Sequence, residues 1–131
     1  MNNYKIMKAI VFSSLLVLSS IFVQGQVVKY KSLNYDIEKP NVEGYETKYL
    51  TTYHTVDFGN SVIKYEYFTA DGNKVSRKYP INAIYDEGTY FRFSINSSGV
   101  KNIWVSRSPY NIEYEFSSGI KFVYYEITQL Q

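Results

Sequence analysis

The clearest pattern in the chain is an alternation of apolar and polar side chains near its C-terminal end. In residues 110–117 every second side chain is aromatic or aliphatic, and the residues between them are polar. Residues 120–128 return with a similar pattern after the tripeptide Ser117-Ser118-Gly119. A period of two on both sides of a short turn predicts an antiparallel hairpin with one apolar face.

A three-residue loop suits this hairpin better than a two-residue loop. It pairs Phe116 with Ile120 and Glu115 with Lys121, so apolar and polar side chains stay on separate faces. A two-residue loop would place Phe116 opposite Lys121 and mix the faces. The three-residue loop needs a left-handed residue at its last position, and glycine adopts that conformation at low cost. We therefore expect a positive φ at Gly119.

The chain between residue 25 and this hairpin carries further short alternating segments, separated by turn residues and without convincing helical periodicity. The first segment changes phase near Lys31, which predicts a bend or bulge. Asp71-Gly72 marks a tight hairpin, and Pro80 predicts the end of a basic edge strand. The segments amount to eight or nine strands, over residues 27–38, 45–58, 62–69, 74–79, 81–85, 89–95, 101–106, 110–117 and 120–128.

Two further expectations concern the turns. A three-residue loop over residues 86–88 would pair Ala83 with Phe91 and Ile81 with Phe93. The tripeptide Ser-Ser-Gly occurs at residues 97–99 and again at 117–119, each time followed by an aliphatic residue and a lysine. This repeat predicts the same turn chemistry at both places.

Short loops make neighbouring strands in the sequence neighbours in space. An all-β, antiparallel up-and-down meander of this size closes into a barrel or folds over as a two-layer sandwich. We favour the barrel because only residues 74–80 look like a protected edge. At the level of the fold, residues 27–128 resemble small secreted barrels of the lipocalin and avidin type in strand count, short loops and aromatic content. The Gly-x-Trp signature of lipocalins is absent, since the only tryptophan is Trp104.

The first 25 residues follow a different pattern. Lys5 and Lys8 precede an apolar run over residues 9–23, and Val23-Gln24-Gly25 offers a cleavage point before Gln26. This is the layout of a secretory signal peptide, and the run is shorter than the roughly 20 apolar residues of a spanning helix. We therefore expect a signal helix in residues 1–25 and one all-β domain in residues 26–131. The domain would be secreted or periplasmic, in contact with a membrane only through the signal before cleavage.

Charge and cysteine content exclude several classes of function. Lys5 and Lys8 are two of the 14 basic residues, and all 12 acidic residues follow residue 25, so the remaining chain is formally neutral at 12 against 12. This balance gives no support for a nucleic-acid partner. The absence of cysteine excludes a lipobox, disulfides, thiol catalysis and cysteine-based zinc sites. One histidine with scattered carboxylates indicates no metal site, and no motif indicates a cofactor.

His54 is the natural candidate for a general base, and spacing argues against it. His54 and Asp57 are three residues apart in a predicted strand, so their side chains point to opposite faces. We expect an ordinary strand histidine with a polar neighbour.

The paired carboxylates are also expected to be structural. Glu113 and Glu115 share a strand face about 7 Å apart, as two carboxylates of a glycosidase could. Lys121 on the opposite strand favours solvated charges with one cross-strand ion pair instead. The run Arg77-Lys78-Tyr79 is expected to be a solubilising edge and not an anion site. No catalytic residue is predicted.

Tyrosine is the one residue type whose abundance suggests a function. The chain has 15 tyrosines, and each combines a large apolar ring with a hydroxyl that needs a partner when buried. Rings that face a barrel interior either fill the core, as aromatic residues do in any sheet, or surround a small apolar or sugar-like ligand. The candidate ligand-binding residues are Tyr65, Tyr67, Phe93, Trp104, Tyr114 and Tyr124.

Two hypotheses of function follow. The first is a secreted or periplasmic β-barrel that binds a small ligand in its interior, without catalysis. The second is an extracellular or cell-surface module that binds a protein or a glycan through its loops or a sheet edge, which an exposed aromatic patch would favour. The sequence does not specify the ligand, the partner or the oligomeric state.

Overall fold

The chain forms one antiparallel sheet of nine strands in the computed structural model, which describes residues 26–106 and 111–130. The predicted signal segment and residues Ser108, Pro109 and Tyr110 lie outside these ranges. Within them, no helix is long and apolar enough to cross a membrane. The strands are β1 (Val27–Glu38), β2 (Glu46–Asp57), β3 (Val62–Phe68), β4 (Lys74–Asp86), β5 (Tyr90–Ile95), β6 (Val100–Ser106), β7 (Ile112–Phe116), β8 (Lys121–Tyr125) and β9 (Thr128–Leu130).

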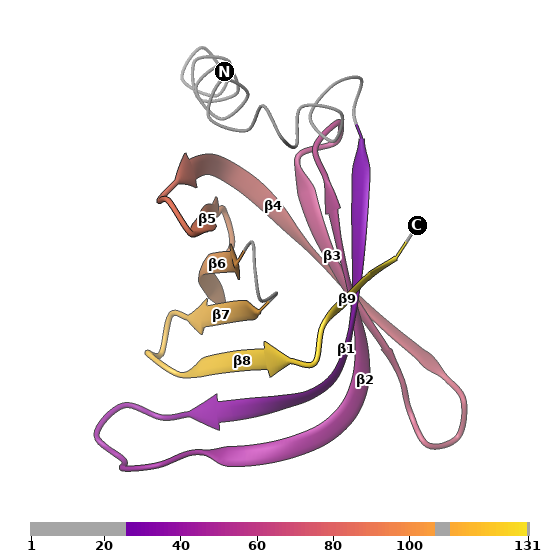
Figure 1. Cartoon of the computed structure of the whole chain (residues 1–131), viewed down its shortest axis with the longest axis vertical. Helices are drawn as coiled ribbons and strands as arrows, with labels where there is room; N and C mark the ends of the chain where they lie inside the picture. Colours follow the sequence, from indigo (N-terminus) through magenta and orange to yellow (C-terminus); the bar gives the residue numbers. More distant parts are fainter. Residues whose placement is uncertain (1–25, 107–110, 131) are drawn as a thin grey trace.

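The sheet closes into an eight-stranded barrel (Figure 1). Strands β2 to β8 follow one another in chain order, and β1 pairs with β8 on one side and with β2 on the other. The β1–β2 register runs from Val27 opposite Asp57 to Ile37 opposite Glu46. The predicted up-and-down barrel is confirmed, and the two-layer sandwich is excluded because all strands belong to one closed sheet.

The ninth strand continues β8 along the same edge of β1. β8 ends opposite Asn34, and β9 begins opposite Lys31 in the same register. Between them Glu126 has a φ of 50°, and β1 shifts its register towards β2 between Ser32 and Asn34. Ser32 Oγ donates a hydrogen bond to the carbonyl of Tyr125 at 2.7 Å. The irregularity predicted near Lys31 is therefore confirmed, and it coincides with the bend between β8 and β9.

The hairpin of β7 and β8 has the predicted register. Glu115 lies opposite Lys121, and the Phe116 N–H donates to the carbonyl of Ile120 at 2.9 Å. Gly119 has a φ of +91°, as the three-residue loop requires. A β-carbon on Gly119 would also lie 3.3 Å from Cγ of Pro40 in the β1–β2 loop.

The predicted loop over residues 86–88 is wrong. The observed partners around this hairpin are Asp86 with Phe91, Ile84 with Phe93 and Ile81 with Ile95. The register of β4 shifts between Ile81 and Ala83, so the strand changes phase and both Ile81 and Ile84 are buried. A regular alternation through Ala83 could not predict this bulge.

β4 is one strand of 13 residues where two were expected. Its first half, residues 74–80, pairs with β3, and its second half, from Ile81 onward, pairs with β5. Pro80 lies where the partner changes, and it has no N–H to contribute to a ladder. Its carbonyl accepts a hydrogen bond from the N–H of Asn96 at 2.9 Å. Among the described residues, the basic segment 74–79 pairs with β3 alone, which agrees with its predicted edge character.

The two Ser-Ser-Gly turns differ from each other, so the prediction of a shared turn chemistry is wrong. Gly119 is left-handed and Gly99 is not. The Gly99 N–H donates instead to Ser97 Oγ at 3.3 Å. The turns also bond each other, because the Ser117 N–H donates to the carbonyl of Gly99 and Ser117 Oγ donates to the carbonyl of Ser98. The turn at residues 117–119 therefore helps to hold the turn at residues 97–99 in place.

The interior of the barrel has two unlike halves. The half that includes the β2–β3 and β4–β5 loops is filled with aliphatic and phenylalanine side chains, among them Phe58, Ile63, Ile84, Phe93 and Ile103. The opposite half holds mainly tyrosines, with His54 between the two. The first half is a packed core, and the second half contains the cavity.

Candidate functional site

A cavity of about 250 Å³ opens at the tyrosine-rich end of the barrel. Its described lining comes from six strands, β1, β2, β3, β4, β7 and β8. The lining residues are Tyr35, Leu50, Tyr65, Tyr67, Arg77, Tyr79, Tyr114, Phe116, Phe122 and Tyr124. Eight of these ten residues are tyrosine or phenylalanine, so a ligand here would lie among aromatic rings.

Strand alternation explains how these side chains meet. Tyr65 and Tyr67 are two residues apart on β3, and Tyr114 and Phe116 are two apart on β7. Side chains at such spacing share a face of the sheet, which here is the inner one. Tyr114 lies opposite Phe122 on β8, and Tyr35 of β1 lies opposite Tyr124. Cross-strand pairing thus continues the aromatic wall around the barrel.

Tyr65, Tyr114 and Tyr124 form the floor of the cavity, and His54 lies beneath it, in contact with all three rings. The His54 ring is 1% exposed, and its centroid lies 4.5 Å from that of Tyr124 and 5.5 Å from that of Tyr114. Nε2 shares a hydrogen bond with Thr52 Oγ1, and Nδ1 shares one with the Tyr114 hydroxyl, each at 2.8 Å. Hydroxyl groups can donate or accept, so both ring nitrogens are satisfied in either neutral tautomer.

Burial keeps this floor uncharged. Desolvation lowers the pKa of His54 to about 3 and raises the pKa of Tyr65 to about 12. It also raises the pKa of Tyr114 and Tyr124, and the hydroxyls of Tyr65 and Tyr124 are hydrogen-bonded to each other. At neutral pH the floor is therefore a set of neutral rings and hydroxyls.

The wall nearer the opening is a stack of rings. Phe122 lies between Tyr35, at a centroid distance of 5.1 Å, and Phe116, at 4.7 Å. Tyr35 also lies 4.9 Å from Tyr124. Such tilted and edge-on contacts hold the rings in fixed orientations, so the wall is formed before any ligand arrives.

The barrel is open at this end because two hairpins separate there. β2 pairs with β3 only over residues 52–57, residues 46–49 pair with β1 alone, and residues 50 and 51 lie at the register shift between β1 and β2. Figure 1 shows the β1–β2 hairpin and the β3–β4 hairpin diverging beyond this point. Leu50 and Tyr67, on the two sides of the gap, line the cavity.

The structure brings four of the six predicted ligand-binding residues to this one cavity: Tyr65, Tyr67, Tyr114 and Tyr124. Phe93 faces the interior as expected, but it belongs to the packed core, is 3% exposed and lies 6.3 Å from the ring of Phe58.

The expectation that Trp104 lines the interior is wrong. Its neighbours on β6, Ile103 and Val105, are the buried ones, so alternation turns Trp104 outward. On the outer face it lies opposite Arg92 and Glu113.

Sequence reasoning missed six lining residues: Tyr35, Leu50, Arg77, Tyr79, Phe116 and Phe122. Phe116 and Phe122 could have been found, because the predicted hairpin register places both on the face of Tyr114. His54 was expected to have a polar neighbour, and it has two, Thr52 and Tyr114. No local signal placed His54 under a cavity, because the floor of that cavity is assembled from strands far apart in the chain.

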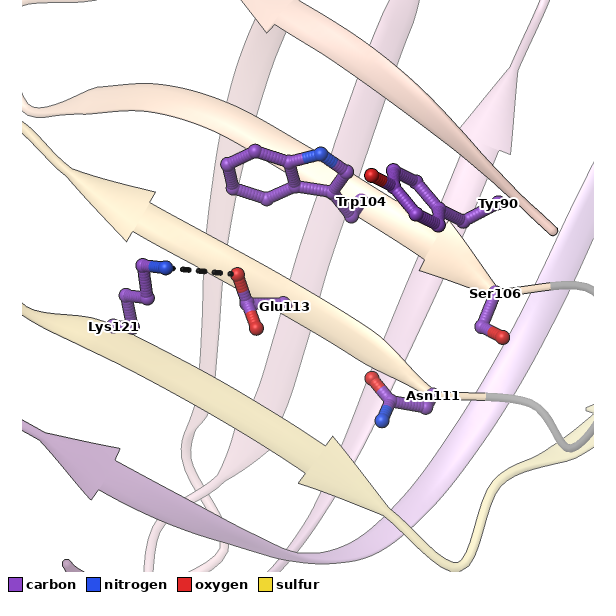
Figure 2. A pocket seen from close by; sticks show the side chains of 6 residues that line it. All are labelled: Tyr90, Trp104, Ser106, Asn111, Glu113 and Lys121. Atoms are coloured by element: carbon purple, nitrogen blue, oxygen red, sulfur yellow. Dashed lines mark ion pairs between the residues drawn. The ribbon is translucent and has the colours of Figure 1, made fainter. Parts of the chain in front are cut away.

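A second hollow, of about 390 Å³, lies on the outer face of β5 to β8. Figure 2 shows the rings of Trp104 and Tyr90 side by side, with polar side chains on the neighbouring strands. Lys121 Nζ lies 3.6 Å from a carboxylate oxygen of Glu113 and 5.8 Å from the centroid of Trp104. The described lining residues are Tyr90, Trp104, Ser106, Asn111, Glu113 and Lys121.

Glu113 and Glu115, the predicted carboxylate pair, interact with different residues. Glu113 makes the expected cross-strand ion pair with Lys121, although Glu115 is the residue opposite Lys121 in the register. Glu115 accepts a hydrogen bond from Asn102 Nδ2 at 2.9 Å. Within residues 26–106 and 111–130, no three histidine or acidic side chains are grouped so that they could hold a metal ion.

Two sequence comparisons find no match for this chain. No protein-family model matches it, and no curated protein sequence matches it either.

Proposed function

We propose that this protein binds one small ligand in the cavity of its barrel and performs no catalysis. The observation that carries the proposal is the aromatic cavity at the open end, because the rest of the interior is packed and this part is not. Ligand sites in proteins are typically concave and mostly apolar, with a few polar groups that fix orientation. The aromatic wall and the hydroxyls of the floor supply both elements.

Binding is a better account of this cavity than acid–base chemistry. A catalytic histidine needs a pKa near the working pH, whereas burial lowers the pKa of His54 to about 3. Its hydrogen-bond partners are the hydroxyls of Thr52 and Tyr114, and neither is a carboxylate. Glu113 and Glu115, the other candidates, are on the outer face of the barrel.

The proposal places the protein outside the cytoplasm. Its support is the signal-like pattern of residues 1–25, with Lys5 and Lys8 ahead of an apolar run. The expected location is the periplasm or the medium, with the signal removed.

Native mass spectrometry tests the binding proposal. The protein is produced from the full sequence, purified without denaturation, and compared with its acid-unfolded form. We expect a discrete additional mass that disappears on unfolding. Leu50→Trp should fill the cavity and remove the adduct, whereas Thr51→Trp, at the exposed neighbouring position, should retain it. An adduct that survives Leu50→Trp, or a bare mass for all three proteins, would count against the proposal.

A second candidate function is glycan binding on the outer face. The specific observation in its favour is the pairing of Trp104 and Tyr90 with Asn111 and Glu113 in one hollow (Figure 2). Aromatic faces beside hydrogen-bonding side chains suit the apolar and hydroxyl faces of a sugar ring. Glycan-array binding that is lost in Trp104→Ala and kept in Leu50→Trp would favour this function. Binding that is kept in Trp104→Ala and lost in Leu50→Trp would favour the cavity.

A further inference from the structure

Arg77 is the one formally charged residue in the described lining of the cavity. The other nine lining residues are tyrosines, phenylalanines and a leucine. Because burial also keeps the floor neutral, the charge that a ligand meets in this cavity is the guanidinium of Arg77. The lining includes no carboxylate to oppose it.

Alternation on β4 separates Arg77 from the rest of its basic segment. Arg77 lies opposite Tyr65 and lines the cavity, whereas Lys78 lies opposite Lys64 on the outer face. The outer face also contains Glu66, which lies 2.7 Å from Lys74 Nζ and 3.8 Å from Lys64 Nζ. The basic run predicted to be a solubilising edge thus includes one cation, Arg77, that lines the cavity and is itself exposed to solvent.

The described carboxylates near the opening have partners of their own. Glu66 is on the other face with its two lysines. Glu46 lies 2.9 Å from Lys48 Nζ, and Lys48 is the register partner of Tyr35 at the cavity. In the described part of the chain, no acidic side chain lies within ion-pair distance of Arg77. Arg77 therefore lines the cavity as a solvent-exposed cation without an acidic partner among the described residues.

We propose that the ligand of this cavity is a small planar aromatic acid, with its carboxylate at Arg77 and its ring system among the tyrosine and phenylalanine rings. This inference rests on the proposed function and adds the chemical class of the ligand. A guanidinium presents a planar fork of donors that matches both oxygens of a carboxylate. Ring stacking supplies the apolar part of the affinity.

The size of the cavity limits the ligand to one or two rings. A volume of about 250 Å³ equals that of roughly eight liquid water molecules. Tyr114 and Tyr124 close the inner end, so most of a long acyl chain would have to lie outside the opening. The tyrosine hydroxyls of the floor can hydrogen-bond a polar group of the ligand at the end opposite its carboxylate.

The test compares two probes of almost equal shape, 2-naphthoate and its neutral amide, 2-naphthamide, by calorimetric titration. We expect the wild-type protein to bind naphthoate about tenfold more tightly than naphthamide, as one charge-assisted contact provides. Arg77→Gln should reduce naphthoate affinity to that of the amide and leave the amide unchanged. Lys78→Gln, which removes the same charge from the other face, should leave the preference intact.

The outcomes separate this inference from the proposed function. Equal affinity of wild-type protein for the two probes, or a preference that survives Arg77→Gln, would overturn the anion site while the cavity remains a binding site. Binding of neither probe would overturn both. A preference lost equally in Lys78→Gln would show a general effect of net charge and would also overturn the assignment to Arg77.

Discussion

His54 and Tyr114, 60 residues apart in the chain, share a hydrogen bond of 2.8 Å between the imidazole Nδ1 and the phenolic oxygen. The bond joins β2 to β7 across the barrel interior, and both side chains are almost completely buried. It fixes the floor of the cavity, since the imidazole on its other side is held by Thr52. Several measurable properties follow from this contact and its surroundings.

Tyr114→Phe should destabilise the protein by about 1–3 kcal/mol, because it leaves a buried imidazole nitrogen without a partner. Tyr49→Phe is the matched control, since Tyr49 is 82% exposed. It should change the free energy of unfolding by less than about 0.5 kcal/mol. Chemical denaturation of the three proteins measures both effects. Equal stability of Tyr114→Phe and wild type would show that the contact is not maintained in solution.

Stability should fall as the pH decreases from 7 to 5. In the folded protein the pKa of His54 is lowered to about 3, and in the unfolded chain it is about 6.5. Between these values the unfolded state binds one more proton, so the stability present above pH 6.5 is lost on acidification. The limiting slope is about 1.4 kcal/mol per pH unit.

His54→Gln tests the origin of that slope. Other groups also contribute, since the carboxylates of Glu66 and Asp57 have lowered pKa values. Carboxylate stabilisation of this kind is lost only as the pH falls towards 4 and below. Urea denaturation between pH 7 and 5 should therefore give a flatter profile for His54→Gln than for wild type. Parallel profiles would assign the slope to other groups.

Gly119→Ala should cost about 1–2 kcal/mol of folding free energy. An L-residue at a φ of +91° is strained, and its β-carbon would lie close to Pro40. Gly99→Ala is the natural comparison, because Gly99 ends the same Ser-Ser-Gly tripeptide and nothing lies within 4 Å of the added carbon. It should be nearly neutral in a thermal or chemical unfolding experiment. A larger loss at Gly99 than at Gly119 would contradict the assigned turns.

Amide hydrogen exchange should divide β2 into two parts. Residues 52–57 pair with both β1 and β3, whereas residues 46–49 pair with β1 alone and residues 50 and 51 have no register partner. Backbone groups with one partner strand open more easily than groups with two. Mass-spectrometric exchange should therefore show slow exchange over 52–57 and faster exchange over 46–51. Uniform protection along the strand would mean that the gap between the two hairpins is closed in solution.

The fold was predictable where local pattern and turn chemistry agreed. Gly119 allowed one loop type only, and that loop placed Glu115 opposite Lys121 as observed. Prediction failed at the turn between β4 and β5, where Asp86 pairs with Phe91 and the loop is shorter than expected. It failed again at Trp104, because the hydrophobicity of a ring does not tell which face of a closed sheet it occupies.

The site was predictable only in its chemistry. The abundance of tyrosine pointed to an aromatic interior, and Tyr65, Tyr67, Tyr114 and Tyr124 do line the cavity. Arg77 was assigned to a surface edge because its neighbours are basic and Pro80 follows. Its place in the lining of the cavity depends on the register of β3 with β4, which only the three-dimensional pairing supplies.

A chain with one histidine has one imidazole to observe. In nuclear magnetic resonance its ring signals need no assignment, and their source lies directly beneath the cavity. Ring currents from the surrounding tyrosines make those signals sensitive to small displacements of the floor. The protein therefore contains its own spectroscopic reporter of occupancy, and each probe or variant discussed above can be screened through a single resonance without any label.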